Sequence, residues 1–501
     1  MSLYNRCMIA ALPPAPRAHL RCKRRPGRRA WPAALLLLFA SLASAGLPRP
    51  VVRAFADQRI PMSAVSAFVQ ELGDAQPLFT QDPSKPMNPA STMKLVTTFA
   101  ALELLGPDYR WRTEAYADGK ITDGVLDGNL VLKGYGDPKV TVEQFQELVA
   151  RLRSTGLSAI RGDLVLDRSF FALVRHDPAA FDGEPLKPYN VGPDALLVSF
   201  KSVRFVFAPN ANGSAVEVRA EPPLPGVRIH GSPTLVAGDC SDWRVALQPV
   251  FSNHADSADA TFQGQYAASC GERDWYVALL DHPHFVRDVF AQTWSAAGGA
   301  FSGGVRDGRP GRGAKLLATL ESAPLYDVVR DINKMSNNVM ARQLFLTLAT
   351  TAYPAPATTA HSSAVVKHWL ARRALNFPEL VLENGSGLSR HERISARSMG
   401  RLLMAAYGSD VRADYVSSLA VSATDGTVRR RFENDAVAEQ AFLKTGSLEG
   451  VRAIAGYVFA PDNRKFVVVC LVNHPNAAAA QLPIDTLVEW IYHSTDAARA
   501  P

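Results

Sequence analysis

Three short motifs follow one another along the chain and contain the residue types of a serine acyl-transfer site. They are Ser91-Thr92-Met93-Lys94, Ser336-Asn337-Asn338 and Lys444-Thr445-Gly446. Each pattern, Ser-x-x-Lys, Ser-x-Asn and Lys-(Ser/Thr)-Gly, occurs once in the sequence. A serine hydroxyl becomes a good nucleophile only when a nearby base takes its proton, and a lysine can be that base. The three motifs therefore predict one site that forms a covalent acyl intermediate.

The first motif is predicted to lie at the beginning of a helix. Asn88 suits the N-cap of that helix and Pro89 its first turn. Apolar residues follow at helical spacing up to a Gly106-Pro107 stop: Leu95, Phe99, Leu102 and Leu105. Because residues three apart share one face of a helix, Lys94 is expected one turn from Ser91. The backbone N–H of Ser91 lacks an intrahelical partner there and could donate to a developing oxyanion.

The third motif supplies a second positive charge. Lys94 can act as a base only if its pKa falls from about 10.4 toward neutrality, through burial or a neighbouring cation. Lys444 is the candidate for that cation, within a strand predicted over 441–447. Gly446 would let a substrate backbone approach this strand closely. A returning strand is predicted over 451–459, so the motif should lie at the edge of an antiparallel sheet that faces the nucleophile helix.

These motifs resemble those of the active-site serine penicillin-recognising enzymes. Lys94 and Ser336 are 242 positions apart, whereas Asn338 and Lys444 are separated by an ordinary 106. The long insertion is similar to that of the class C low-molecular-mass penicillin-binding proteins, the D-alanyl-D-alanine carboxypeptidase/endopeptidase family. Further segments resemble the same family: Gly128-Asn129-Leu130-Val131-Leu132, Gly134-Tyr135-Gly136-Asp137-Pro138, Gly162-Asp163-Leu164-Val165-Leu166-Asp167, Lys187-Pro188-Tyr189-Asn190, Gly385-Ser386-Gly387-Leu388-Ser389 and Asp425-Gly426-Thr427. Turn chemistry accounts for the last two segments without a catalytic role.

The resemblance implies a set of catalytic residues. Ser91 would be the acylated nucleophile and Lys94 its base. Ser336 would relay a proton toward the leaving amine, and Asn338 would hydrogen-bond the substrate amide or hold Lys94 in place. Lys444 would bind the terminal carboxylate of a D-Ala-D-Ala peptide.

The resemblance also implies substrate-binding residues and shows two departures. Thr445 would hold the terminal carboxylate together with Lys444, and Gly446 would lie beside the bound substrate. The N–H of Ser447 would be a second oxyanion donor. Asn337 replaces the aspartate that is common in the second motif, where the side chain usually points away from the chemistry. Asn384 replaces an aspartate that commonly precedes the Gly-Ser-Gly loop, so no role is assigned to it.

The function implied by the resemblance is that of a periplasmic serine DD-carboxypeptidase and DD-endopeptidase. Such an enzyme cleaves D-Ala-containing bonds of peptidoglycan stem peptides and cross-links, and β-lactam antibiotics acylate its serine. A β-lactamase is the alternative enzyme, but no dedicated deacylating glutamate is recognisable, and the long insertion argues against it. A weakly catalytic cell-wall-binding scaffold is the other alternative. The intact Ser91, Lys94 and Lys444 weigh against a pure binder.

The implied fold is α/β, or more closely α+β. It is a penicillin-binding/β-lactamase-like transpeptidase domain, an antiparallel sheet with helices on both faces, with a large, mostly β insertion after the nucleophile helix. About 456 residues beyond residue 45 are too many for one core. We expect a discontinuous catalytic domain over 46–108 and 290–501, and an inserted region over 109–289.

Local patterns add detail to these domains. The inserted region could itself divide into about 109–192 with 266–289, and 193–265, which is rich in short apolar β-like runs. Helices are expected over 142–155 in the insertion, over 327–348 around Ser336, and over 482–492 near the end.

The first 45 residues are typical of a secretory signal peptide. Residues 1–29 contain eight Lys and Arg and no acidic residue, and an apolar run follows that ends in Ala43-Ser44-Ala45. Removing these eight of the 54 basic residues leaves 46 to set against 47 acidic residues. The basic balance therefore belongs to the leader, so a nucleic-acid partner is not expected, and contact with a membrane is expected to be peripheral at most.

The cysteines fit an oxidising compartment. Of five, Cys7 and Cys22 belong to the leader. Cys240 and Cys270 lie in polar, loop-like surroundings of the insertion and could form a disulfide. Cys470 lies in an apolar run over 466–472, where a free thiol behaves as a small hydrophobic group.

The sequence lacks the motifs of several other kinds of enzyme site. The sequence contains no His-Glu-x-x-His zinc pattern, no Gly-x-Ser-x-Gly elbow and no Gly-x-Gly-x-x-Gly turn between a strand and a helix. His282-Pro283-His284 suits a loop better than a ligand pair. Neither a metal nor a cofactor is expected.

Overall fold

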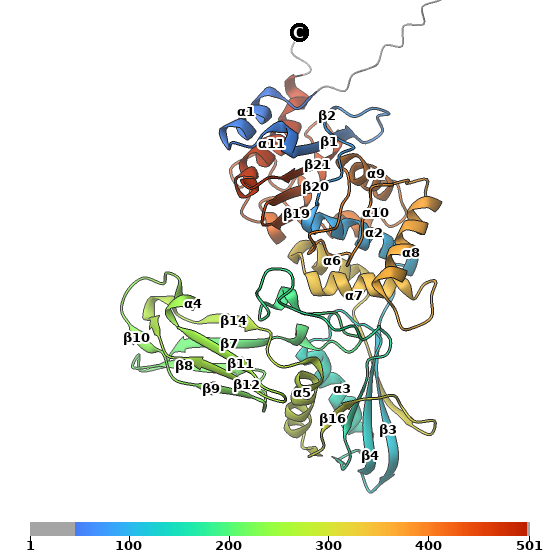
Figure 1. The fold of residues 1–501 in the computed structure, drawn as a ribbon, viewed down its shortest axis with the longest axis vertical. Helices are drawn as coiled ribbons and strands as arrows, with labels where there is room; N and C mark the ends of the chain where they lie inside the picture. Colours follow the sequence, from blue (N-terminus) through green and yellow to red (C-terminus); the bar gives the residue numbers. More distant parts are fainter. Residues whose placement is uncertain (1–45, 498–501) are drawn as a thin grey trace, which may run out of the picture. The chain divides into compact units, whose positions relative to one another are not determined.

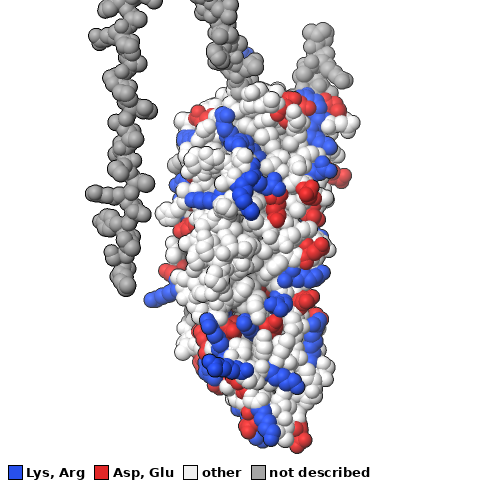
Figure 2. All heavy atoms as spheres, turned by 90° about the vertical axis from the view of Figure 1, so that its right-hand side faces the viewer, with Lys and Arg blue, Asp and Glu red and all other residues white. Residues whose placement is uncertain are grey.

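The computed structural model describes residues 46–497. The predicted signal peptide over 1–45 lies outside the described residues. Within the described part, no helix combines the length and the apolar character needed to cross a bilayer. Figure 2 shows basic and acidic side chains interspersed over one face, with an uncharged area around its middle. Side chains of both signs therefore lie near one another on this face.

A six-stranded antiparallel sheet forms the centre of the catalytic domain (Figure 1). Its order is β18-β19-β20-β21-β1-β2, and every neighbouring pair is antiparallel. The strands are β18 (Ala420–Val421), β19 (Ala441–Leu448), β20 (Val451–Phe459), β21 (Lys465–Asn473), β1 (Val65–Glu71) and β2 (Phe79–Gln81). The strands predicted over 441–447 and 451–459 are therefore confirmed.

Each face of this sheet packs on its own core because successive side chains of a strand point to opposite faces. In β21, Phe466, Val468 and Cys470 join the core beneath the terminal helices. Val467 and Val469 join the core of the helical layer on the other face. A strand buried on both faces accounts for the unbroken apolar run, and the buried free thiol expected for Cys470 is confirmed.

Helices cover both faces, as predicted. On one face lie α1 (Arg49–Asp57) and α11 (Gln481–Ala497), which pack against each other, and α11 confirms the helix expected near 482–492. The other face carries α2 (Lys94–Leu105), α6 (Leu325–Met335), α7 (Asn338–Ala349), α8 (Thr359–Arg372), α9 (Ala396–Tyr407) and α10 (Arg412–Ser417). The helix predicted over 327–348 is thus two helices, α6 and α7, separated at Ser336 and Asn337.

The inserted region contains a second, seven-stranded sheet. Its strands are β3 (Arg112–Thr122), β4 (Val125–Gly134), β5 (Ala159–Ile160), β6 (Leu164–Asp167), β15 (Ala300–Phe301), β16 (Val305–Asp307) and β17 (Lys315–Glu321). Helices α3 (Val142–Ser154) and α5 (His282–Ala296) pack against it. Helix α3 confirms the expectation for 142–155 and begins with a capping box between Thr141 and Gln144. The His282 segment is the first turn of α5, so the loop expected there is wrong.

The strand pairing differs from the expected boundary at residue 289. Strand β17 pairs antiparallel with β3, and β15 and β16 pair with β5 and β6. Residues up to Glu321 therefore belong to the inserted sheet, because a strand cannot be separated from its hydrogen-bonded neighbours. We place the end of the insertion near residue 322.

A smaller β unit extends from this region. Its sheets are formed by β14 (Arg273–Val277), β7 (Val203–Pro209) and β8 (Val216–Glu221); by β11 (Pro249–Asn253), β12 (Ala258–Phe262) and β9 (Val227–His230); and by β10 (Thr234–Val236) with β13 (Gln265–Ala267). Because β14 pairs with β7, this unit continues past the expected limit at 265.

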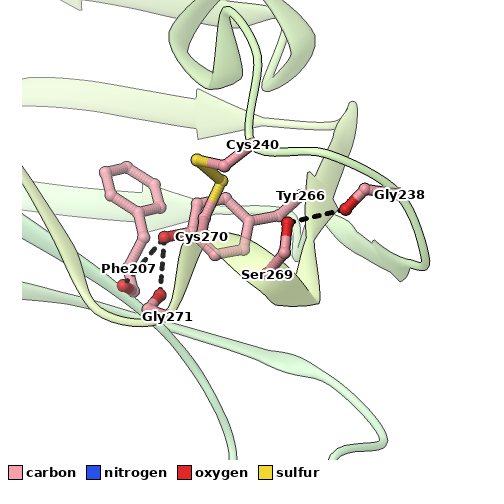
Figure 3. Close-up of a disulfide and its surroundings, with 7 residues drawn as sticks. All are labelled: Phe207, Gly238, Cys240, Tyr266, Ser269, Cys270 and Gly271. Carbon is pink, nitrogen blue, oxygen red and sulfur yellow. Dashed lines mark hydrogen bonds between the residues drawn. A yellow bond between two sulfur atoms is a disulfide. The ribbon is translucent and has the colours of Figure 1, made fainter.

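A disulfide joins Cys240 to Cys270 in the small β unit (Figure 3). Next to it, the hydroxyl of Tyr266 donates to the backbone oxygens of Phe207 and Gly271, at 3.4 and 2.8 Å. The pairing that the sequence left open is therefore present, and it closes a loop of 30 residues.

Candidate active site

Ser91 lies in a 3-10 turn, Ala90–Met93, that leads directly into α2. Asn88 fixes the entrance of this turn, but not as the helix cap that the sequence predicts. Its Oδ1 accepts from the N–H of Ala90 at 2.9 Å, and its Nδ2 donates to the carbonyl of Ser389 at 2.8 Å. Its backbone exchanges two hydrogen bonds with the amide of Asn473, at 2.8 and 3.0 Å. The nucleophile turn is thus tied to the end of β21 and to the loop that contains Ser389.

Lys94 is fully buried, and its amine contacts three oxygen atoms. Nζ lies 3.0 Å from Ser91 Oγ, 2.6 Å from Asn338 Oδ1 and 2.5 Å from the carbonyl oxygen of Ser386. The amide oxygen and the carbonyl can only accept hydrogen bonds. A neutral amine donates its two N–H groups to them, which leaves its lone pair to accept the hydroxyl proton of Ser91. The contacts therefore orient Lys94 as a base toward Ser91.

The surroundings of Lys94 favour its neutral form. Burial lowers the pKa of Lys94 well below its ordinary value, and the positive charges of Lys444 and Arg342 lower it further. The carboxylate of Glu392 acts in the opposite direction on this pKa. Lys444 is also fully buried, and burial lowers its pKa to about 7. No carboxylate lies within salt-bridge distance of either amine among the described residues.

The second motif lies where the chain breaks between two helices. Ser336 has φ 57° and ψ 34°, a left-handed conformation that ends α6. Asn337 caps α7, because its Oδ1 accepts from the N–H of Met340 at 3.0 Å. Asparagine and aspartate cap helices about equally well, so the departure at Asn337 leaves the geometry intact. Asn338 begins α7 and points its amide oxygen at Lys94.

The third motif lies on β19, beside the nucleophile turn. Lys444 Nζ donates to Ser336 Oγ at 2.7 Å and to the carbonyl of Thr445 at 3.0 Å. Gly446 was expected to make room for a substrate, but the close neighbour is the nucleophile turn itself. A Cβ at Gly446 would lie 2.6 Å from the carbonyl oxygen of Pro89. Glycine is therefore needed for β19 to pack against this turn.

Strand β19 has an open side next to the site. Strand β18 pairs only with Phe442 and Leu443, so the described residues provide no strand partner for that side of β19 from Lys444 onward. The hydroxyl of Thr445 donates to the exposed hydroxyl of Thr427 at 2.7 Å. Exposed Ser447 accepts from Arg452 at 2.8 Å. An extended peptide could add to this open side as a further strand.

All eight residues that the sequence singled out lie on three adjoining segments. Lys94 directly contacts Ser91 and Asn338, and Lys444 contacts Ser336. Thr445, Gly446 and Ser447 follow along β19, which packs against the nucleophile turn. The three motifs therefore meet in one place.

Sequence reasoning missed the loop that contains Ser386. The loop was assigned to turn chemistry alone, yet its backbone carbonyl is one of the three contacts of Lys94. Asn384 has a structural role: its Oδ1 accepts from the N–H and hydroxyl of Ser386, and its Nδ2 donates to the carbonyl of Leu388. An aspartate could not make the last bond. Thr427 was missed as well, although the Asp-Gly-Thr segment signalled a turn at that place.

A cavity of about 710 Å³ adjoins the loop that contains Ser386. One wall comes from the insertion and includes Arg175, Asp177 and Phe181. The opposite wall comes from the catalytic domain and includes Arg342 and Leu388. The cavity is lined by both charged and apolar side chains.

Comparison with known proteins shows that the chain is similar to D-alanyl-D-alanine carboxypeptidases. The model of the D-Ala-D-Ala carboxypeptidase 3 (S13) family matches residues 49–493. The D-alanyl-D-alanine carboxypeptidase DacB of Haemophilus influenzae is 26% identical over 420 residues, which is 83% of this chain and 87% of the relative. The D-alanyl-D-alanine carboxypeptidase of Actinomadura sp. (strain R39) is 26% identical over 461 residues, which is 86% of this chain and 81% of the relative.

Solved structures agree with this. The crystal structure of penicillin binding protein 4 from Haemophilus influenzae superposes with a TM-score of 0.73 at 25% identity, covering 89% of this chain and 99% of that one. The same relative has been crystallised in complex with a β-lactam, and that structure gives a TM-score of 0.70. The predicted penicillin-binding fold with a large, β-rich insertion is confirmed.

Proposed function

The chain belongs to the D-Ala-D-Ala carboxypeptidase 3 (S13) family, and we propose that it works through an acyl-enzyme on Ser91. Its substrates are peptidoglycan stem peptides that end in D-Ala-D-Ala. The observation that carries the proposal is the buried Lys94 amine, 3.0 Å from Ser91 Oγ, with two carbonyl oxygens to accept its N–H groups.

In acylation, Lys94 accepts the hydroxyl proton of Ser91 while Oγ attacks the carbonyl carbon of the penultimate D-Ala. The negative charge that develops on the carbonyl oxygen is stabilised by the backbone N–H groups of Ser91 and Ser447. The C–N bond then breaks, and the terminal D-Ala leaves as an amine. Its nitrogen takes up the proton of the Ser336 hydroxyl, which the protonated amine of Lys444, 2.7 Å away, replaces. The proton that Lys94 accepted returns to Lys444 through solvent before water attacks the ester. Water later cleaves the ester and restores Ser91.

The terminal carboxylate of the substrate is bound at β19. Lys444 supplies a positive charge, and the hydroxyl of Thr445 supplies a hydrogen bond. Lys444 serves both the carboxylate and the proton path, since it contacts Ser336 as well. Gly446 keeps the strand close to the turn that carries Ser91.

The same chemistry applies to two further classes of molecule. A cross-link has a D-Ala carbonyl at the reacting position and a diamino acid as the leaving group, so the enzyme also acts as an endopeptidase. A β-lactam presents a strained amide next to a carboxylate, and it acylates Ser91 without releasing a leaving group. The β-lactam complex of the Haemophilus influenzae relative supports this part of the proposal.

The compartment proposed for the enzyme is the periplasm. The disulfide between Cys240 and Cys270 fits an oxidising environment. The basic and apolar composition of residues 1–45 is typical of a secretory leader.

Labelling with fluorescent penicillin tests the nucleophile. We expect covalent labelling of the purified protein, and loss of the label in Ser91→Ala with an unchanged melting temperature. Ser409→Ala, the same substitution at a position two residues after the end of α9, is the matched control and should label normally. Label retained in Ser91→Ala would contradict the proposal, and rapid turnover of penicillin would favour a β-lactamase instead.

Incubation with purified sacculi tests the substrate. Mass spectrometry should show stem peptides shortened by one alanine, which reports carboxypeptidase activity, and loss of cross-linked dimers, which reports endopeptidase activity. A preparation in which Ser91 is labelled but neither product forms would refute the proposed substrates.

A further inference from the structure

Glu392 is a fully buried carboxylate around which the Ser386 loop is folded. Its Oε1 accepts from the N–H groups of Glu383, Asn384 and Gly385, at 3.0, 2.9 and 2.8 Å. Its Oε2 accepts from the N–H of Gly387 at 2.9 Å. Four donors from five consecutive residues therefore converge on one side chain.

The carbonyl groups of this loop point the other way, to the nucleophile helix. The carbonyl of Gly385 accepts from Thr97 at 2.6 Å, and that of Ser386 accepts from Lys94 at 2.5 Å. Gly387 packs so closely that a Cβ there would lie 1.9 Å from the carbonyl oxygen of Ala90. The loop thus lies between Glu392 and the first turns of α2.

The hydrogen bonds indicate that Glu392 is ionised. All four hydrogen bonds that its two oxygens accept come from backbone N–H donors, whereas a protonated carboxyl would need an acceptor for its own proton. Burial raises the pKa of Glu392, and the backbone N–H groups oppose that rise. The charges that face Lys94 are those of Lys444 on β19, Arg342 on α7 and Glu392. Arg342 itself is faced by Glu392 and Glu383.

We propose that Glu392 is a positioning residue for acylation: it holds the Ser386 carbonyl against the amine of Lys94 and provides a negative charge that balances Lys444. Without the carbonyl, one N–H of the neutral amine loses its acceptor, and the lone pair is no longer fixed toward Ser91. Without the charge, two cations act on the amine with nothing to oppose them. This inference rests on the proposed role of Lys94 as the base.

The test is the pH dependence of Ser91 acylation by fluorescent penicillin between about pH 5 and about pH 9, a range that brackets a lysine of lowered pKa. Activity rises with pH as Lys94 loses its proton. Glu392→Gln removes a negative charge that stabilises the protonated amine of Lys94. The acidic limb of the pH–rate profile, the part where the acylation rate rises with pH, should therefore move to lower pH by about one unit. Glu392→Asp keeps the charge on a shorter side chain. Its plateau should fall about ten- to hundredfold through misplacement, with the limb unmoved.

Glu379→Gln is the matched control. Glu379 accepts from the N–H of Ser395 at the start of α9, and it is not among the charges that face Lys94. It should leave the limb in place. A Glu392→Gln limb that coincides with the wild-type limb would overturn the inference, as would a Glu392→Asp variant identical to wild type. If Glu392→Gln does not fold, Glu392→Asp alone decides the positioning role. If the proposed function itself were wrong, the wild-type protein would not be labelled at Ser91, so the two kinds of failure can be distinguished.

Discussion

Two lysines without a carboxylate partner lie fully buried in the site, and this arrangement costs stability. Burial lowers the pKa of Lys444 to about 7, whereas an unfolded lysine stays protonated up to about 10.4. Between these values the unfolded state binds more protons than the folded state. The folded protein therefore becomes more stable as pH rises through this window, and it bears the full cost of burial below it. The same burial lowers the pKa values of the two amines, which lets Lys94 act as a base, so the loss of stability accompanies the catalytic function.

Lys444→Met should separate stability from activity. An apolar side chain of similar length removes the buried charge, so we expect an increase of about 1 to 3 kcal/mol in the free energy of unfolding at neutral pH. Acylation by penicillin should be lost. The gain should shrink as pH rises from about 7 and reach its minimum above about 10.4, where the lysine is neutral in both states. Melting temperatures at neutral and alkaline pH would measure this.

Lys367→Met, an exposed lysine on α8, is the control and should change the melting temperature little at either pH. A Lys444→Met protein that melts below wild type at neutral pH would show that the hydrogen bonds of Lys444 outweigh the cost of its burial.

At the residue scale, the sequence predicted the chemically distinctive side chains well. Ser91, Lys94 and Lys444 belong to patterns that each occur once, and the structure brings them together. The contribution of Ser386 could not be predicted, because a backbone carbonyl is present at every position and only the fold selects one. Glu392 was missed for a related reason: a glutamate among polar residues usually indicates an exposed surface.

At the element scale, the break between α6 and α7 decides where Ser336 lies. The apolar spacing predicted one helix over 327–348, and no glycine or proline marks an interruption there. The left-handed conformation of Ser336 is imposed by its surroundings, which include the bond to Lys444 and the cap of α7 by Asn337. Asn337 is a residue type that favours an N-cap, but a single cap residue within an unbroken apolar spacing does not by itself predict a break, so one helix was predicted in place of two.

The last turn of α6 also fixes the loop beside β19. Lys334 forms an ion pair with Asp425, whose Oδ1 accepts from the N–H of Val421 at 2.9 Å. Gly426 packs against the carbonyl of Lys334, and Thr427 then reaches the hydroxyl of Thr445. This loop connects the second motif to the third.

Asp425→Ala should weaken substrate binding. It removes the acceptor of Val421 and the partner of Lys334, so Thr427 and Thr445 lose their fixed positions. We expect kcat/KM for a D-Ala-D-Ala peptide to fall about tenfold, mainly through a higher KM. Steady-state kinetics would measure this. Lys334→Met keeps the bond to Val421 and should show a smaller effect, and an unchanged KM in Asp425→Ala would argue against the connection.

At the scale of the whole molecule, the sequence located the insertion but not its end. The nucleophile helix and the second motif bracket it, and short β-like runs marked its character. The pairing of β17 with β3 could not be predicted, because these strands lie some 200 positions apart and alternation alone does not select a partner. The boundary at residue 289 was therefore placed too early, although the antiparallel sheet and both helical layers were predicted.

The disulfide should stabilise the small β unit without affecting the site. Closing a loop of 30 residues contributes about 3 to 4 kcal/mol by chain entropy. Replacing Cys240 and Cys270 with serine should therefore speed hydrogen exchange in 203–277, as mass spectrometry would detect. The rate of Ser91 acylation should stay within about twofold of wild type. A large loss of acylation would instead show that the unit is coupled to catalysis.

Two glycines from different segments, Gly387 and Gly446, both pack closely against the turn that carries Ser91. At either position the first added methyl group would meet backbone oxygen atoms, at 1.9 Å from Ala90 and 2.6 Å from Pro89. Backbone cannot rotate aside as a side chain can, so added bulk there displaces the nucleophile itself. Substitutions at these two positions therefore could not give resistance to a β-lactam, because displacing Ser91 would also abolish the reaction with the natural peptide substrate. Resistance mutations would have to lie at residues farther from Ser91, where the inhibitor and the natural peptide differ in shape.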